Sequence, residues 1–121
     1  MKYLLMIYDN AGSRELFAGE QGAGLMAEMD ALFAELKESG ELIGTDALAD
    51  PSSTKVVRAP DPSAPVVTDG PLAEAKEHFG GYLIVDVASP DRAIEIAARF
   101  PGTRFTPMEV RPILGDSGEE M

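Results

Sequence analysis

The sequence contains no cysteine among its 121 residues, and this absence excludes thiol nucleophiles, disulfide bonds and cysteine-ligated metal sites. It contains a single histidine, His78, and the carboxylates alone show no spacing typical of a metal site. We therefore expect neither a metal nor another cofactor. A chain of this length predicts one domain, which buries about two-thirds of the surface of its unfolded chain without such staples.

Basic residues are also scarce, at 10 Lys and Arg against 21 Asp and Glu, which gives a formal net charge of −11. A field of that sign repels phosphate backbones and anionic membrane surfaces, so we expect no nucleic-acid partner. No apolar run approaches the roughly 20 residues of a membrane-spanning helix. The short apolar N-terminal stretch lacks a small-residue cleavage site. These features predict a cytoplasmic protein that has no membrane association.

The first third of the chain predicts a strand followed by a helix. Residues 3–8 are apolar on both alternating faces, which is typical of a central strand covered on both sides. Residues 9–24 show no sustained period, and no element is predicted there. From residue 25 the apolar positions recur at helical spacing, and Gly40 is a favourable residue to end that helix. The helical stripe comprises Leu25, Met26, Met29, Leu32, Phe33 and Leu36.

Two short β-rich segments follow, at residues 41–48 and 54–59. The proline and serines between them predict a turn, so we expect the two segments to pair as a hairpin. Residues 60–65 contain three prolines and predict an irregular surface loop. A brief extended piece at residues 66–68 comes next.

The last third predicts a strand, a helix and a strand. Residues 82–87 are strongly β-type and are entered through Gly80-Gly81. Ser89 and Pro90 then have the character of an N-cap and of a first helical residue. We expect that helix to end at Pro101.

The final predicted strand spans residues 108–114. Pro112 within it favours an edge position or a strand end, because proline cannot donate to the ladder. Two strand-helix-strand units predict an α+β ferredoxin-like sandwich, with one antiparallel sheet and two helices on one face. Its other face stays bare, so we expect a homodimer. The domain is predicted over residues 1–114, followed by an acidic disordered tail at 115–121.

Six short motifs spread along the chain resemble the YCII-related family, specifically its DGPF-domain branch. They are Lys2-Tyr3-Leu4-Leu5, Val57-Arg58, Val67-Thr68-Asp69-Gly70-Pro71, Glu74-Ala75-Lys76-Glu77, Gly80-Gly81-Tyr82 and Glu109-Val110-Arg111-Pro112. The resemblance runs from about residue 2 to about residue 114 and is specific as a set.

The resemblance implies a dimeric α/β-barrel fold. Relatives in the wider superfamily include small isomerases, a dehydrochlorinase and monooxygenases that need no metal, while the branch is also associated with sigma-factor-like transcription regulators. The chain departs from the branch at Leu72, where phenylalanine is expected. The histidine-aspartate pair suspected in some relatives is not transferred here, because His78 is the sole histidine.

Asp69 is the main catalytic candidate. As a turn, Asp69-Gly70-Pro71 is explained by the side-chain hydrogen bond of aspartate, the freedom of glycine and the fixed φ of proline. The extended signature around it favours a functional carboxylate equally. At a strand end, Asp69 could serve as a general base beside a cavity. Its neighbours Thr68, Gly70 and Pro71 are then expected to line a substrate-binding site.

Arg58 and Arg111 lie in β-type segments and are candidates for holding an anionic substrate. A structural ion pair, for example between Arg111 and Asp69, explains them equally well. His78 follows Glu74 by four residues, so on a helical turn the two would share a face as an acid-base pair. A solvated or capping role for His78 is the alternative, and the charges around Glu74 are then a solvated face.

Two functions are compatible with these residues. The first is a small cofactor-independent isomerase or lyase in which Asp69 moves a proton and Arg58 and Arg111 hold a small anionic or phenolic ligand. The second is a non-catalytic dimeric module that binds a ligand or takes part in transcriptional regulation. In a third interpretation, Asp69 and the arginines only stabilise the fold.

Overall fold

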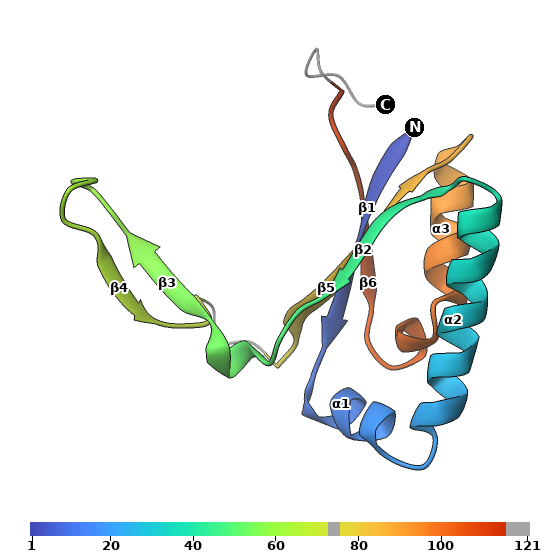
Figure 1. Cartoon of the computed structure of the whole chain (residues 1–121), viewed down its shortest axis with the longest axis horizontal. Coiled ribbons are helices and arrows are strands. Elements are labelled where there is room, and N and C mark those ends of the chain that lie inside the picture. Colours follow the sequence, from blue (N-terminus) through green and yellow to red (C-terminus); the bar gives the residue numbers. More distant parts are fainter. Residues whose placement is uncertain (73–75, 116–121) are drawn as a thin grey trace.

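The computed structural model describes residues 1–72 and 76–115, and its body is a sheet covered by helices on one face (Figure 1). The sheet is antiparallel, with strand order β2-β5-β1-β6. This is the order of a ferredoxin-like sandwich, and the predicted α+β fold is confirmed. The strands are β1 (Lys2–Asp9), β2 (Leu42–Ala47), β5 (His78–Asp86) and β6 (Met108–Pro112).

Helices α2 (Gly22–Glu38) and α3 (Pro90–Arg99) form the covering layer. The helix α3 begins as its sequence predicts, because the Ser89 hydroxyl accepts a hydrogen bond from the backbone N–H of Arg92 at 3.2 Å. The core between the layers is apolar and mostly aliphatic, and it also contains two aromatic residues. It is built from Tyr3, Leu5, Leu32, Leu36, Leu83, Val85, Val87, Ala93, Ile96, Ala97 and Phe100.

A third helix, α1 (Ala11–Ala18), occupies the stretch in which no element is predicted. A capping box forms it: Asn10 Oδ1 accepts from the N–H of Ser13 at 2.8 Å, and Ser13 Oγ accepts from the N–H of Asn10 at 2.9 Å. The box carries serine in place of the usual Glu or Gln, and the helix has no long apolar stripe. Local capping therefore determines α1, and hydrophobic periodicity does not reveal it.

Strand β5 begins at His78, so Gly80 and Gly81 lie inside the strand and do not precede it. The register between β1 and β5 shifts here, from Ile7 opposite Gly81 to Tyr8 opposite Phe79, which leaves Gly80 as the extra residue of a bulge. Glycine inside a strand often marks such a bulge or a close approach of other atoms. Both apply at this position.

The predicted hairpin of residues 41–48 with 54–59 is wrong. Strand β2 pairs with β5 in the main sheet, whereas β3 (Lys55–Arg58) pairs with β4 (Val66–Asp69) in a separate two-stranded ribbon. The proline-rich loop between β3 and β4 connects this ribbon at its tip. A 3₁₀ turn, η1 (Pro51–Ser53), redirects the chain between β2 and the ribbon. The proline and serines therefore do form a turn, but this turn separates the main sheet from the two-stranded ribbon.

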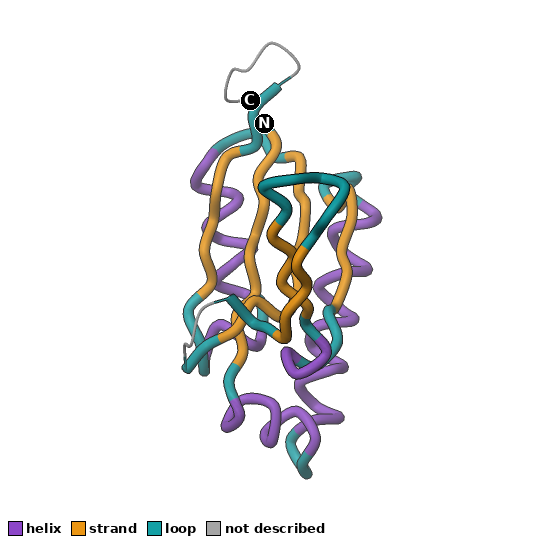
Figure 2. The backbone as a smooth tube through the Cα atoms, turned by 90° about the vertical axis from the view of Figure 1, so that its left-hand side faces the viewer, coloured by secondary structure: helices purple, strands orange, loops and turns teal. Residues whose placement is uncertain are grey.

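We call residues 54–70 the arm. It projects away from the main sheet on the side opposite the helices, as Figures 1 and 2 both show. At its base the backbone N–H of Gly70 donates to the carbonyl of Thr54 at 2.9 Å. The arm is thus a closed ribbon attached to the body at one end.

The C-terminal region agrees with its prediction where the structure describes it. Strand β6 lies at an edge of the sheet and ends at Pro112, as the proline predicts. It follows α3 through a 3₁₀ turn, η2 (Pro101–Arg104). The tail predicted at residues 115–121 lies outside the described residues except for Gly115. No described helix combines the length and the apolar character needed to cross a membrane.

Candidate functional site

A cavity of about 460 Å³ lies between the sheet and the helices, near the end of β1. Its volume is in the range of small-molecule sites. The walls are mainly apolar and aromatic, which suits a flat, weakly polar ligand. The apolar lining comprises Ile7, Phe17, Met26, Met29, Phe33, Ala47 and Phe100.

A carboxylate and a guanidinium lie at one side of this cavity. Asp9 is the last residue of β1, and its Oδ1 accepts a hydrogen bond from Nη1 of Arg14 at 2.7 Å. The two side chains keep 30% and 37% of their surface exposed, so a ligand can reach them from the cavity. The capping box fixes the first turn of α1 and thereby the position of Arg14. The charge-assisted hydrogen bond between Asp9 and Arg14 therefore lies beside the apolar part of the cavity.

Two glycines of β5 make room for this arrangement. A Cβ atom added at Gly80 would overlap the carboxylate of Asp9, and one added at Gly81 would lie 2.8 Å from the carbonyl oxygen of Asp46. Either atom would have to displace its neighbour. The bulge at Gly80 therefore lets the Asp9 carboxylate lie against the backbone of β5.

The hydroxyl groups around the cavity are engaged with the protein itself. Thr106 Oγ1 donates to the carbonyl of Tyr8 at 2.6 Å, and Thr45 Oγ1 donates to the carbonyl of Tyr82 at 2.8 Å. The third charged lining residue, Asp46, accepts from the Tyr82 hydroxyl at 2.5 Å. This contact raises the pKa of Tyr82. The pair of Asp9 with Arg14 is thus the feature of the cavity best suited to a ligand.

The structure places the predicted catalytic Asp69 elsewhere. It ends β4 on the arm, its side chain is 86% exposed, and its Oδ1 pairs with Nζ of Lys55 at 2.5 Å. The suggested ion pair of Arg111 with Asp69 is therefore wrong. Arg111 lies in β6 opposite Leu4 of the main sheet, far along the chain and the fold from the arm.

The other arm residues of the predicted site do not converge on a cavity within the described chain. Arg58 pairs with Val66 at the opposite end of β3 from Lys55, so it is separated from Asp69 along the ribbon. Thr68 is exposed opposite Val56. Gly70 serves packing, since an added Cβ would lie 2.9 Å from a methyl group of Thr54. These residues share one ribbon without forming a pocket there.

Pro71 and His78 do meet, in a second, more open pocket of about 340 Å³ at the base of the arm. His78 begins β5 and lies opposite Asp9 in the sheet register, so its predicted place on a helical turn is wrong. Glu74, its predicted partner, lies outside the described residues. Asp50 borders the same pocket; hydrogen bonds from Ser52, and more weakly the charges of Arg14 and His78, lower its pKa.

Sequence reasoning missed Asp9 and Arg14. The available signal was indirect: Asp9 ends a strand that is apolar on both faces, and the Gly80-Gly81 pair interrupts the strongly β-type strand that pairs with it. Among the described residues, no group of three or more histidine and acidic side chains is placed to hold a metal ion.

Comparison with known proteins agrees with this fold. A family model described as the YCII-related domain matches residues 1–115. An uncharacterised protein of Rhizobium meliloti (strain 1021) is 27% identical over 115 residues, which cover 93% of this chain and 92% of the relative.

A solved structure with the same fold is that of 5-chloro-2-hydroxyhydroquinone dehydrochlorinase from Burkholderia phenoliruptrix AC1100, in complex with 2,5-dihydroxybenzoquinone. It aligns with a TM-score of 0.50 and 18% identity, covering 98% of this chain and all of the other. At that identity the similarity shows a common fold and does not transfer an activity.

Proposed function

Since this chain belongs to the YCII-related family, we propose that it is a small cofactor-independent enzyme of the isomerase or lyase type, which moves a proton in the cavity beside Asp9. The observation that carries the proposal is the Asp9 carboxylate, held against Gly80 and paired with Arg14 at the wall of an apolar cavity. Catalytic acids and bases commonly lie in such clefts.

The geometry suggests a division of labour between the two charged groups. Asp9 would accept a proton from a hydroxyl or an activated C–H group of the ligand, and its protonated form would return that proton at another position or to a leaving group. Arg14 would stabilise the oxyanion that forms on the ligand. The aromatic walls favour a flat ring, so the proposed substrate class is a small phenol or enol.

The structural relative supports this class, because the ligand in its complex is a hydroxylated quinone. The same proposal assigns the base to Asp9 and not to Asp69, since Asp69 is on the solvent-exposed arm and is neutralised by Lys55. A general base has to lie within hydrogen-bond reach of the proton that it removes. Asp9 borders a cavity in which a bound ligand would lie within that reach.

The decisive experiment compares Asp9→Asn with Asp69→Asn. A thermal-shift screen with 2,5-dihydroxybenzoquinone and simple dihydroxyphenols identifies a ligand, because one at 100 times its Kd adds about 2.7 kcal/mol to stability. Turnover of that ligand is then followed spectroscopically. We expect Asp9→Asn to abolish turnover and Asp69→Asn to keep it. The reverse result would return the catalytic role to Asp69.

A second candidate function is a non-catalytic ligand-binding module, for which the ion pair itself is the supporting observation. The Asp9 carboxylate is already engaged by the Arg14 guanidinium at 2.7 Å, so the pair could hold a ligand as a fixed unit without moving a proton. In that case the cavity binds the same class of ligand without converting it. Binding without turnover in the intact protein, together with loss of binding in Arg14→Gln, would favour this function over catalysis.

We also propose that two copies associate through the uncovered face of the main sheet. Because Tyr3 and Leu5 point into the core, Leu4 and Met6 point to the opposite face, where both are only half-buried. Tyr82 and Ile84 lie beside them on β5. Glu109 and Arg111 of β6 lie opposite Met6 and Leu4, so the face is apolar over β1 and β5 and charged along its β6 edge. A sheet face of this kind favours an isologous dimer. Light scattering is expected to give twice the 12.9 kDa chain mass, and Met6→Glu to give the monomer.

A further inference from the structure

Among the residues that the structure describes, the arm has few contacts outside its own two strands. Its strands β3 and β4 pack chiefly on each other, while three valines remain largely exposed: Val57 at 61%, Val66 at 55% and Val67 at 57%. The register pairs Val57 with Val67, so these two side chains lie together on one face of the ribbon. Val66 lies opposite Arg58 and therefore on the other face, so apolar side chains are exposed on both faces of the ribbon. Exposed β-branched residues of this kind mark a contact surface.

An isolated two-stranded ribbon is at best marginally stable in water. The arm has four residues in each strand and no covering helix or third strand among the described residues. Contacts from another molecule would therefore stabilise the arm. From these observations we propose that the arm clasps a second copy of this chain.

The direction of the arm identifies that occupant. Figure 2 looks onto the main sheet with the helices behind it, and the arm stands in front of the sheet. Figure 1 shows the same relation from the side, with the arm and the helices on opposite sides. A copy stacked on the uncovered sheet face would lie in the space beside the arm. By two-fold symmetry each copy would extend its arm along the other.

Charge agrees with a second copy as the occupant. Within the arm, Lys55 and Arg58 balance Asp61 and Asp69, so the arm has no net formal charge while the chain carries −11. A neutral ribbon approaches an acidic copy without repulsion. Lys55 already pairs with Asp69, whereas no described carboxylate pairs with Arg58, which leaves Arg58 available to the acidic partner.

The arm proposal rests on the sheet-to-sheet dimer proposed above, and it assigns a place to the signature residues that the cavity does not use. Arg58, Thr68 and Asp69 belong to the ribbon that reaches the second copy. In this role they determine assembly and not proton transfer.

The test changes the valines without changing the ribbon. In Val57→Thr, Val66→Thr and Val67→Thr combined, each residue stays β-branched and keeps its strand propensity, while the apolar contact is lost. We expect the dimer Kd, measured by sedimentation velocity, to rise about tenfold or more. The matched control is Ile94→Thr, a 56% exposed residue on the helix side. It should leave the Kd unchanged.

Hydrogen exchange provides a second, independent measurement on the unaltered protein. The backbone amides of β3 and β4 are expected to be protected at high protein concentration and to exchange rapidly on dilution below the dimer Kd. The amides of β1 and β5 stay protected at both concentrations, because they lie within the four-stranded sheet. Protection of the arm that does not depend on concentration would overturn the clasp.

The two proposals fail in different ways. If the wild-type protein is monomeric at micromolar concentration, both the dimer and the clasp are ruled out. If Met6→Glu disrupts the dimer but the combined valine variant leaves it intact, the clasp alone is ruled out. Turnover or ligand binding in the cavity is read separately, because the cavity lies on the helix side of the sheet.

Discussion

Gly80 lies against the carboxylate of Asp9, where any Cβ atom would overlap it. We expect Gly80→Ala to displace this carboxylate and to disturb its pair with Arg14, so ligand affinity should fall about tenfold to a hundredfold, corresponding to 1.4 to 2.8 kcal/mol. Isothermal titration with the ligand found in the screen measures this change. Phe100 belongs to both the cavity wall and the core, so a native near-ultraviolet circular dichroism spectrum is the check that the core is unchanged.

The control for this substitution is Gly44→Ala in the neighbouring strand β2. A Cβ there meets no atom within 4 Å, so the same chemical change occurs in open space. Equal losses of affinity in Gly80→Ala and Gly44→Ala would show that the strand backbone, and not the position of the Asp9 carboxylate against Gly80, determines binding.

For single residues, Asp69 and Asp9 show how much of the candidate site can be predicted from the sequence alone. Asp69 was correctly placed at a strand end, because Gly70 and Pro71 follow it. Its absence from the linings of the two cavities described above follows from the projection of the arm, which no local pattern encodes. Asp9 has a plain sequence environment, and it becomes a site only through the bulge at Gly80 and the capping of α1. The bulge is a pairing between distant segments, whereas the capping box is local but carries serine in place of the usual Glu or Gln.

Among the helices, α2 offers a matched pair of glycines in its first turn. At Gly24 a Cβ meets no atom within 4 Å, whereas at Gly22 it would overlap the carbonyl group of Phe17. We expect Gly24→Ala to raise the unfolding free energy by about 0.5–1 kcal/mol, because alanine is the better helix former. Gly22→Ala should lower it by about 1–3 kcal/mol through overpacking.

Chemical denaturation of both variants measures these changes, with the slope of the unfolding curve checked against wild type. Stabilisation by both substitutions would mean that α1 is not packed against the start of α2 as observed. That result would also weaken the placement of Arg14, which depends on α1.

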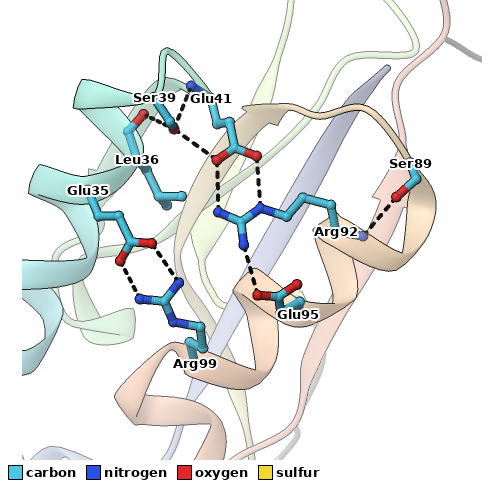
Figure 3. A network of polar contacts seen from close by, with 8 residues as sticks. All are labelled: Glu35, Leu36, Ser39, Glu41, Ser89, Arg92, Glu95 and Arg99. Carbon is cyan, nitrogen blue, oxygen red and sulfur yellow. Dashed lines mark hydrogen bonds and ion pairs between the residues drawn. The ribbon is translucent and has the colours of Figure 1, made fainter.

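An ion pair joins the start of β2 to α3 and is the centre of the network in Figure 3. Arg92 donates from Nε and Nη2 to the two carboxylate oxygens of Glu41, at 2.9 and 2.8 Å, and the Ser39 hydroxyl donates to the same carboxylate at 2.8 Å. These contacts, that of Arg92 foremost, lower the pKa of Glu41 from 4.5 to about 2.

Because the folded state depresses this pKa, the pair stabilises the protein fully above pH 4.5 and is lost as the pH falls from 4.5 towards 2. We expect Glu41→Gln to cost about 1–2 kcal/mol at pH 7, since the pair is bidentate and largely shielded from water. Denaturation curves at pH 7 and pH 2.5 should show the difference between variant and wild type shrinking on acidification.

The matched control is Glu95→Gln, which removes the single, more exposed contact that Arg92 makes on its own helix. Exposed pairs of this kind contribute about 0–1 kcal/mol, so the variant should stay close to wild type. A Glu41→Gln effect that keeps its size at pH 2.5 would contradict the ionic origin of the stabilisation.

At the element scale, the order of the main strands and of the two longer helices could be predicted because each leaves its own periodic pattern or cap. The pairing of β3 could not. Its segment is as β-rich as β2, and the turn between them looks like a hairpin turn. The partner of each strand depends on the register of the whole sheet, in which β2 pairs with β5.

For the whole molecule, the net charge of −11 determines how two copies meet. Like-charged chains repel over about 30 Å at 0.01 M salt and over about 8 Å at 0.15 M. The proposed dimer interface contributes apolar contact from the sheet face and the neutral arm, which salt does not screen. We therefore expect the dimer Kd to fall severalfold as sodium chloride rises between these concentrations.

Sedimentation velocity over a dilution series at each ionic strength gives that dependence, and the valine variant of the arm provides the comparison. It should show the same salt slope from a weaker starting affinity, because the substitutions leave every charge in place. A Kd that rises with salt would mean that complementary ion pairs hold the copies together. Arg58 on the arm and Arg111 on the sheet edge would then be the residues to replace next, each with glutamine, since both are exposed cations on an otherwise acidic chain.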